Sequence, residues 1–198
     1  MKNTAAKILR VISRKAKNEI FTTRQMLSFG LRGEVDQVMY SLVKCGDIHR
    51  VAWGVFVIAG SDLSKITDEQ IAMAKASAFK REIVEHATDA GERFGIHGPA
   101  NKGPTYSTRA RSTSFLNRIT GIRIYFKGVS ARKFVSAGSV TGDVLRSLWN
   151  LTKDGLTDAA LDTATIMMNA SHRAELPEFA DLMPEWLHEH FHRAWSSA

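Results

Sequence analysis

The stretch "FTTRQMLSFGLRGEVDQVMYSLVKCGDIHRVAWGVFVIAG", residues 21–60, decides how the first part of the chain is expected to fold. It contains two short helical patterns with a glycine between them, followed by alternating apolar residues. A helix, a turn, a second helix and a small hairpin, in this order, make a winged helix-turn-helix. The stretch therefore predicts a module that reads DNA.

Local signals place the first helices of this module. Apolar residues at helical spacing predict an amphipathic helix over residues 4–17. Thr22 and Gln25 have the spacing of a capping box, which predicts the start of a short helix over 23–29. Gly30 is expected to end that helix with a left-handed turn.

The second helix and the hairpin follow directly. Apolar residues recur at helical spacing over 33–45, and Gly46 is expected to end this helix. The segments "IHRV" and "VFVI", residues 48–51 and 55–58, then flank Gly54 as two short strands. Three helices and a two-stranded wing account for a first domain over residues 1–60.

The rest of the chain predicts a second domain. Residues 61–66 are polar and are interpreted as a linker, so the second domain is expected over 67–198. Its predicted elements are a helix over 67–90, strands over 105–111 and 122–128, and helices over 139–151, 157–172 and 177–195. The predicted fold class is α+β, with a mixed helix and strand domain after the winged helix-turn-helix.

Charge is distributed unevenly along the 198 residues, whose net charge is +7. Residues 1–60 carry ten Lys and Arg against four Asp and Glu, and residues 101–135 carry eight basic residues and no acidic one. Residues 61–100 and 136–198 are acidic, at −2 and −5. Two basic blocks separated by nearly neutral sequence and followed by an acidic tail favour a polyanionic partner, and double-stranded DNA is the partner expected for the first block.

Composition excludes several other classes of protein. Cys45 is the only cysteine, which excludes an internal disulfide and an all-cysteine zinc site. No apolar run approaches the roughly 18 residues of a membrane span, and the N-terminus does not have the pattern of a secretory signal. We therefore expect a cytoplasmic protein without a membrane partner.

The predicted DNA site is centred on the second helix of the motif. Arg32 has the donors to pair with guanine, and Gln37 can pair with adenine. Asp36 is four residues after Arg32, so the two are expected to pair with each other. Trp53 is expected to pack the wing against the first helix, and an aromatic wedge that enters the DNA is the alternative. The full set of predicted DNA contacts is Thr22, Thr23, Arg24, Arg32, Gln37, Tyr40, Ser41, Lys44, His49 and Arg50.

A second basic patch is predicted from the other basic block. Its members are Arg109, Arg111, Arg118, Arg123, Lys127, Arg132 and Lys133. Arg109 and Arg111 would share one face of a strand, and so would Arg123 and Tyr125. Three partners stay open for this patch: nucleic acid, an acidic protein, and the acidic helices at the end of the same chain.

Particular segments of the chain resemble a known family. The runs "FTTRQMLSFG", "VDQVMYSLVKCGDIHRV" and "GVF" resemble the N-terminal winged helix-turn-helix of AbiEi-type antitoxins of type IV toxin–antitoxin systems. The runs "YSTRARS", "IRIYFKGVSARKF" and "GDVLRSLWNLTKDGLTD" are similar to the C-terminal domain of that group, so the resemblance covers most of residues 5–160.

The resemblance implies an antitoxin that represses transcription of its own operon. The DNA partner that it implies is an operator, and inverted repeats are one arrangement expected for that operator. The resemblance also implies functional pairing with a nucleotidyltransferase-type toxin without a stable complex. Two alternatives stay open: a stand-alone transcriptional regulator whose C-terminal domain senses a ligand or dimerises, and a nucleic-acid-processing enzyme.

Signals for catalysis, cofactors and metals are weak. The sequence has no phosphate-binding loop, dinucleotide fingerprint or zinc-protease motif. The glycine–serine pairs of "GSDLSK" and "GSVTGD" are interpreted as turns, because no paired carboxylates follow them. His188 and His192 are four residues apart, but a third ligand is missing, so a surface helix end is favoured. We therefore expect no enzymatic activity, no cofactor and no metal.

Overall fold

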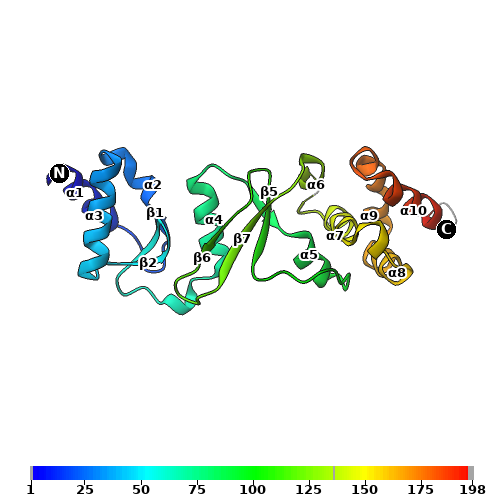
Figure 1. Ribbon diagram of the computed structural model, residues 1–198, viewed down its shortest axis with the longest axis horizontal. Helices are drawn as coiled ribbons and strands as arrows, with labels where there is room; N and C mark the ends of the chain where they lie inside the picture. Colours follow the sequence, from blue (N-terminus) through cyan, green and yellow to red (C-terminus); the bar gives the residue numbers. More distant parts are fainter. Residues whose placement is uncertain (1, 136, 196–198) are drawn as a thin grey trace. The chain divides into compact units, whose positions relative to one another are not determined.

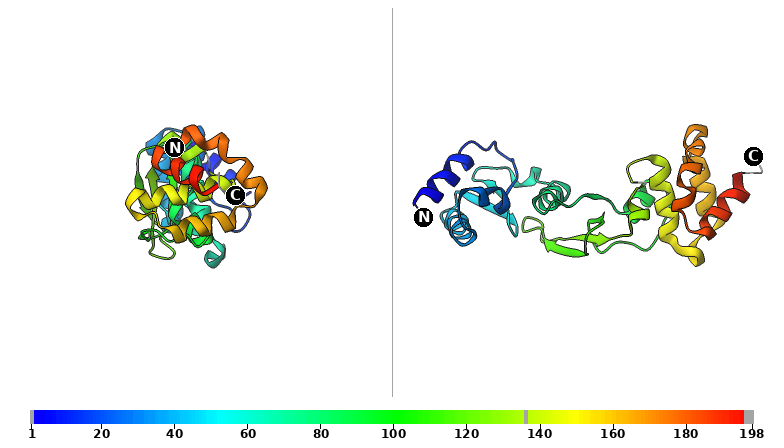
Figure 2. Two further views of the ribbon diagram at one scale, coloured as in Figure 1. Left: turned by 90° about the vertical axis from the view of Figure 1, so that its right-hand side faces the viewer. Right: turned by 90° about the horizontal axis from the view of Figure 1, so that it is seen from above.

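The computed structural model describes residues 2–135 and 137–195 (Figures 1 and 2). Helices alternate with short strands that form two small sheets. The predicted α+β class is therefore confirmed at the level of mixed helix and sheet.

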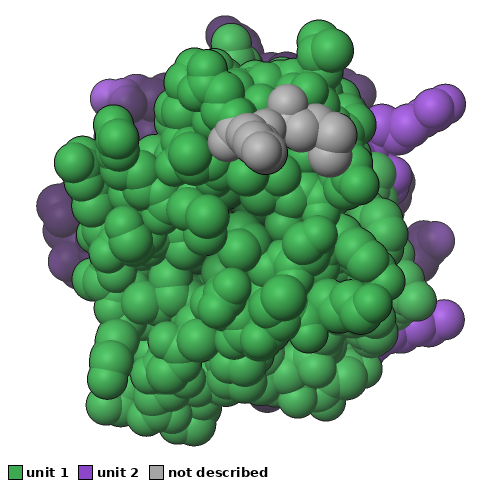
Figure 3. Space-filling model, turned by 90° about the vertical axis from the view of Figure 1, so that its left-hand side faces the viewer, with its two compact units in different colours: residues 1–82, 113–125 green, residues 83–112, 126–198 purple. Residues whose placement is uncertain are grey.

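The chain divides into two compact units (Figure 3). The first unit comprises residues 1–82 and 113–125, and the second comprises residues 83–112 and 126–198. The chain therefore leaves the first unit, returns to it and leaves it again. The predicted domain boundary at residues 61–66 stays a prediction.

The first unit begins with helices followed by a hairpin. Its elements up to residue 58 are α1 (Lys2–Ile12), β1 (Phe21–Thr22), α2 (Thr23–Met26), the 3-10 helix η1 (Leu27–Phe29), α3 (Arg32–Cys45), β2 (Ile48–Ala52) and β3 (Val55–Ile58). The helices and the hairpin strands predicted over residues 21–60 are present. The first helix is shorter than predicted, because it ends at Ile12 instead of residue 17.

Apolar residues from every one of these segments meet in one core. Ile8 of α1, Met26 of α2, Val35 and Met39 of α3 and Phe56 of β3 are all almost completely buried. The apolar face of each helix is therefore turned inward, and its polar face is left for solvent or for a ligand.

The hairpin belongs to a three-stranded sheet with the strand order β1-β3-β2. Phe21 of β1 lies opposite Phe56 of β3, and Phe56 lies opposite Arg50 of β2. The register shifts between Arg50 and Ala52, which marks an irregularity just before the hairpin turn. Gly54 in that turn has a φ of 74°, a conformation that favours glycine.

Two glycines flank helix α3 for different reasons. Gly46 has a φ of 81° and ends the helix in the left-handed conformation, as predicted. The prediction for Gly30 is wrong, because its φ of 178° is extended backbone. Glycine is needed there for space: a Cβ atom would lie 2.6 Å from Cγ2 and 2.7 Å from Oγ1 of Thr4.

The helix predicted over residues 67–90 is wrong beyond residue 78. Its start is correct, since the backbone N–H of Gln70 donates to Oγ1 of Thr67 at 3.1 Å. Helix α4 (Asp68–Ala78) ends where Lys80 adopts a positive φ of 53°. Strand β4 (Ile83–Glu85) follows, and a further helix begins only at residue 87.

Residues 113–125 are tied to the first unit by specific hydrogen bonds. The backbone N–H of Arg118 donates to the carbonyl of Val51 at 2.7 Å. The side chain of Asn117 donates to Oδ1 of Asp68 at 2.7 Å. This segment holds β6 (Thr113–Leu116) and the first half of β7 (Arg123–Gly128), and the sheet has the strand order β4-β5-β7-β6.

The second unit is mainly helical. Its elements besides β4 and the end of β7 are α5 (Ala87–Arg93), β5 (Thr105–Thr108), α6 (Ala131–Val135), α7 (Val140–Gly155), α8 (Asp158–Met167), α9 (Ala170–Ala174), the 3-10 helix η3 (Leu176–Leu182) and α10 (Glu185–Trp195). Helix α7 contacts α5, α8, α9 and α10 (Figures 1 and 2). It is the central helix of this unit.

The C-terminal helices are more broken than predicted. Thr152 interrupts α7 with a φ of 66°. The helix predicted over 157–172 is two helices, α8 and α9, and the helix predicted over 177–195 is the 3-10 helix η3 followed by α10. Pro177 starts a helical segment, as predicted, but that segment is η3.

The described part of the chain contains no helix that is both long and apolar enough to cross a membrane.

Substitution of Gly30 tests the close packing against α1. We expect Gly30→Ala to destabilise the protein by about 1–3 kcal/mol, because the added methyl overlaps buried Thr4. Gly33→Ala is the matched control, since nothing lies within 4 Å of its Cβ position on a helix. It should stabilise the protein by up to about 1 kcal/mol. Urea unfolding measures the change in the free energy of unfolding for both variants. Equal changes would contradict the close packing of Gly30 against Thr4.

Acid stability tests the burial of His86, the residue before α5. Its Nδ1 accepts from the backbone N–H of Thr88 at 3.2 Å. Burial and the nearby cations Lys127, Arg146 and Lys133 lower the pKa of His86 from 6.5 to about 4. The neutral ring is therefore the folded form, and its contribution to stability is present above pH 6.5 and is lost as the pH falls toward 4.

We expect this loss to reach about 2–3 kcal/mol by pH 4. His86→Asn keeps a side chain that can cap the helix but does not titrate, so the difference between the two proteins isolates the histidine. Fluorescence in a Trp53→Phe background would report the second unit, which holds the other tryptophans. If the difference in the free energy of unfolding between the two proteins does not change with pH, the pKa of His86 is the same in the folded and unfolded states.

Candidate nucleic-acid interface

The polar face of helix α3 is fully available. Arg32, Gln37, Tyr40, Ser41 and Lys44 are all exposed. The opposite face of the helix carries its buried residues and anchors it in the core. Five of the predicted DNA contacts therefore lie on the exposed part of one rigid helix.

Arg32 and Asp36 pair with each other on this face, as expected from their spacing. Nε of Arg32 lies 2.8 Å from Oδ2 of Asp36, and both side chains are at least half exposed. An exposed pair of this kind contributes little to stability. It holds the guanidinium by one nitrogen, and the terminal nitrogens have no hydrogen-bond partner among the described residues.

A groove in the first unit brings together residues from four segments. Its volume is about 410 Å³, and it lies between α2, α3, the β2–β3 hairpin and α4. Six of the ten predicted DNA contacts line it, namely Thr22, Thr23, Arg24, Arg32, Tyr40 and Arg50. Gln37, Ser41, Lys44 and His49 do not line it. Thr22 is buried, with 4% of its surface exposed, so its contribution is to the wall of the groove.

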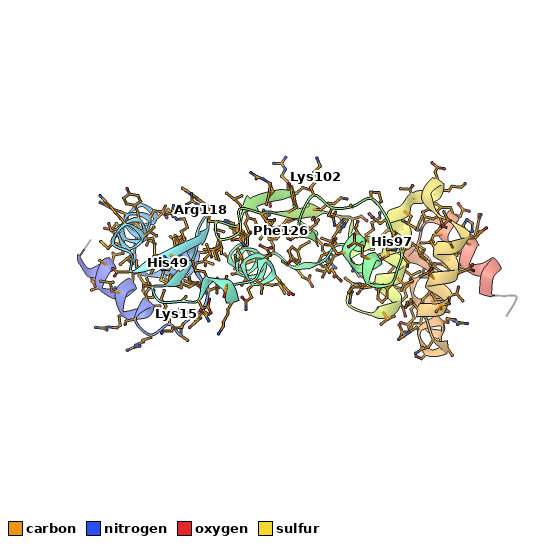
Figure 4. All side chains as sticks on the ribbon, turned by 90° about the horizontal axis from the view of Figure 1, so that it is seen from below. Lys15, His49, His97, Lys102, Arg118 and Phe126 are labelled. Carbon is orange, nitrogen blue, oxygen red and sulfur yellow. The ribbon has the colours of Figure 1, made fainter. Side chains whose placement is uncertain are left out.

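His49 and Arg50 are neighbours on strand β2, and their side chains lie on opposite faces of it. His49 is exposed (Figure 4), whereas Arg50 is half-buried and turned toward the groove. The two residues therefore do not form one contact surface, although both were predicted to contact phosphates.

Arginine and aromatic side chains stack within the groove. The guanidinium of Arg50 lies 5.0 Å from the ring centre of Trp53 and 5.6 Å from that of Phe56. Arg24 lies 5.8 Å from the ring centre of Phe79. Such contacts hold a cation in place while leaving its hydrogen-bond donors available.

The expected packing of Trp53 against the first helix is wrong. Its side chain is 72% exposed at the tip of the hairpin, beside Gly54. The physical reason is that Arg50 covers one face of the indole, so the ring has a partner without entering the core.

Helix α4 and the residue that follows it contribute Lys75, Ala78 and Phe79 to the groove, which the sequence did not indicate. Lys75 donates from Nζ to the backbone carbonyl of Trp53, and Phe79 is exposed beside Arg24. Burial lowers the pKa of the Lys75 ammonium. The helical pattern places Lys75 and Phe79 on one side of a helix, but no local signal indicates that this side faces the hairpin.

The members of the predicted second basic patch are divided between the two units, and the patch itself stays a prediction. Arg118 and Arg123 belong to the first unit, and the other five residues belong to the second. The prediction that Arg109 and Arg111 share a strand face is wrong, because β5 ends at Thr108 and both residues follow it. Arg123 does lie on β7, where its Nη1 donates to Ser114 Oγ at 3.2 Å.

Arg132 has a structural role within the second unit. Its Nη2 donates to the carbonyls of Asp181 at 2.8 Å and Met183 at 3.1 Å, at the end of η3. Arg132 is therefore held by the C-terminal helical segment of its own chain, through backbone carbonyls and not through carboxylates. Arg109 lies 5.1 Å from the ring centre of Phe134.

Both glycine–serine pairs lie in turns and caps. Gly60 has a positive φ of 75°, and the backbone N–H of Ser61 donates to the carbonyl of Ile58 at 3.3 Å. Oγ of Ser139 accepts from the backbone N–H of Gly142 at 3.0 Å and caps α7. These hydrogen bonds account for the two segments without a phosphate ligand.

Residues 2–135 and 137–195 hold no group of three or more His, Cys, Asp and Glu side chains that could bind a metal, within the side chains that the structure describes. His188 is exposed on α10, and the side chain of His192 lies outside those described.

No protein-family model matches the chain, and a comparison with curated proteins finds no match.

A double-mutant cycle tests the stacking at the hairpin tip. We expect Arg50→Ala and Trp53→Ala to show a coupling free energy of about 0.5–1 kcal/mol, because each residue is the other's stacking partner. Thermal unfolding of the wild type, both single variants and the double variant gives this value. Strict additivity would show that the two side chains do not interact in solution.

Proposed function

We propose that the chain is a sequence-specific DNA-binding protein whose first unit acts as a winged helix-turn-helix. The observation that carries this proposal is the exposed polar face of α3 beside a groove lined with arginines. Base edges in the major groove of DNA are read by such a helix, and phosphates are bound by cations around it.

The order of the elements supports this function. Helices α2 and α3 are joined by a short turn, and the β2–β3 hairpin follows α3 after Gly46. Strand β1 pairs with β3, so the hairpin is part of a sheet and is anchored beside the helices. This is the arrangement that a wing needs if it is to contact DNA next to the reading helix.

We assign different roles to the residues of the interface. Arg32, at the start of α3, and Gln37, one turn later, are the base-reading residues. Lys44, in the last turn, contacts a phosphate. Thr23 and Arg24 contact the backbone from α2.

Arg50 supports the wing, and Trp53 at its tip is the wing residue that reaches the DNA. We assign the wing contact to Trp53 because its ring is exposed and Arg50 covers only one of its faces. The exposed face of the indole is the part that can meet a sugar or a base edge.

The biological role that we propose is that of an antitoxin and repressor of its own type IV toxin–antitoxin operon. This part rests on the resemblance of residues 21–60 and of the "IRIYFKGVSARKF" segment to AbiEi-type antitoxins. A second candidate is a stand-alone regulator that responds to a ligand. A polar pocket in the second unit, described below, favours that candidate.

Base reading is tested with two variants on the DNA upstream of the protein's own reading frame. Arg32→Ala and Gln37→Ala should each weaken binding to the footprinted operator by about 1–3 kcal/mol and relax discrimination at one base pair. Both side chains are exposed, so folding should change by less than about 0.5 kcal/mol. Titrations on operator and scrambled duplexes measure the ratio of affinities, and an unchanged ratio would exclude α3 as the reader.

Lys44→Ala separates phosphate contacts from base contacts. It should weaken binding to both duplexes alike and reduce the salt dependence by about one counterion. Lys65→Ala is the matched control, because Lys65 is also exposed but belongs to the 3-10 helix η2 (Leu63–Lys65), outside α3 and the hairpin. If Lys44→Ala changes specificity, or Lys65→Ala has the same effect, the assigned role is wrong.

The antitoxin role needs a cellular experiment. A reporter fused to the upstream DNA should be repressed by the wild type and released by Arg32→Ala. Co-expression should restore growth of cells that carry an adjacent nucleotidyltransferase-type toxin. Repression without such a rescue would favour the stand-alone regulator, and the absence of both would contradict the proposal.

A further inference from the structure

A second pocket lies wholly within the second unit. It has a volume of about 350 Å³ and is formed where the start of α5, the middle of β5, the end of β7 and helices α6 and α7 meet. Its lining includes His86, Ser107, Lys127, Ser130, Lys133 and Arg146, and contains no Asp or Glu. These six side chains are polar or cationic, and Ala87, Gly128, Val129 and Asn150 complete the lining.

The cations of this pocket are only partly neutralised. Asp143 pairs with Arg146, and Arg93 lies 2.6 Å from Glu85 and 3.3 Å from Asp143. Two arginines and two carboxylates therefore balance each other. Lys127 and Lys133 have no carboxylate partner within the described residues, and Nζ of Lys133 lies 4.8 Å from the ring centre of Trp149. The pocket consequently carries an excess of two positive charges.

The titration of neighbouring groups agrees with a positive potential here. After burial, the charges of Lys127, Arg146 and Lys133 are the causes that lower the pKa of His86. The pKa of Lys133 is lowered as well, first by burial and then by Lys127. The positive charge of each of these groups thus disfavours the charged form of its neighbours. A bound anion would stabilise those charged forms.

The inner residues of the pocket are rigidly held. Arg146 is 3% exposed, and its Nη1 donates to the carbonyl of Glu85 at 3.1 Å. Nδ1 of His86 accepts from the backbone of Thr88, so the neutral ring carries its proton on Nε2. Gly128 is required at the rim, because a Cβ atom there would lie 2.7 Å from the carbonyl of Ala110.

We propose that this pocket binds the phosphate group of a small phosphomonoester. A phosphomonoester carries a charge of about −1.5 to −2 at neutral pH, which matches the two unpaired lysines, whereas a carboxylate would neutralise only one. A lysine ammonium is a compact charge with three N–H donors, and a serine hydroxyl has one O–H donor. Several such groups around a pocket can each bind a different oxygen of a tetrahedral anion.

The size of the pocket indicates more than an inorganic ion. Its 350 Å³ corresponds to about ten water-sized volumes and lies at the small end of ligand pockets. There is room for a phosphate with a short organic group. A phosphate of duplex DNA fits less well, because His86, Ser107 and Arg146 are each at most 3% exposed. This inference does not depend on the proposed DNA-binding function.

The experiment uses the full chain in a buffer free of phosphate. Isothermal titration with glycerol phosphate, inorganic phosphate and a scrambled duplex distinguishes the three sources of phosphate. We expect glycerol phosphate to bind, and Lys127→Gln and Lys133→Gln each to weaken that binding by about tenfold or more, the loss typical of one charged hydrogen bond. Lys127 is exposed, and far-UV circular dichroism checks that both variants fold.

Lys102→Gln is the matched control, because Lys102 is an exposed lysine of the same unit that does not line the pocket (Figure 4). The Lys102→Gln variant should bind glycerol phosphate as tightly as the wild type does. The proposal is overturned if glycerol phosphate does not bind, if Lys127→Gln and Lys133→Gln bind it as tightly as the wild type, or if all three variants weaken binding equally. Binding of the duplex but not of glycerol phosphate would also overturn the proposal, because the pocket would then be a site for the DNA backbone.

Discussion

The stacked pair of Phe21 and Phe56 is the interaction on which the first unit depends. Their ring centres are 6.0 Å apart, and both side chains are almost completely buried. Because Phe56 also lies opposite Arg50 in the sheet, this pair fixes the register that turns Arg50 toward the groove and places Trp53 at the hairpin tip. A slip of one residue would turn every side chain of β3 to the other face of the sheet.

The local structure of residues 21–60 could be predicted because its signals are local. The spacing of Val35, Met39 and Leu42 indicates a helix face, and Gly46 and Gly54 have the positive φ angles expected of a cap and a turn. The contacts between distant segments could not be predicted. The hydrogen bond from Arg118 to Val51, and the approach of Lys75 to the hairpin, join residues whose own neighbours give no sign of the contact.

The basic block over residues 101–135 shows what composition cannot resolve. Its eight cations appear equivalent in the sequence. In the structure Arg132 binds carbonyls at the end of η3, Arg109 packs on Phe134, and Lys127 and Lys133 line a pocket with buried His86. The net charge of this block indicated an anionic partner. It did not distinguish the cations that stabilise the fold from those that remain available to a ligand.

The path of the chain between the two units affects how the protein can be divided or recombined. Residues 113–125 belong to the first unit although they are encoded between two parts of the second, and strand β7 is counted with both. No single break in the gene yields both units intact, since a cut after residue 82 removes Asn117 and Arg118 from their partners Asp68 and Val51. Exchange of the first unit for another domain would therefore require two segments to be transferred together.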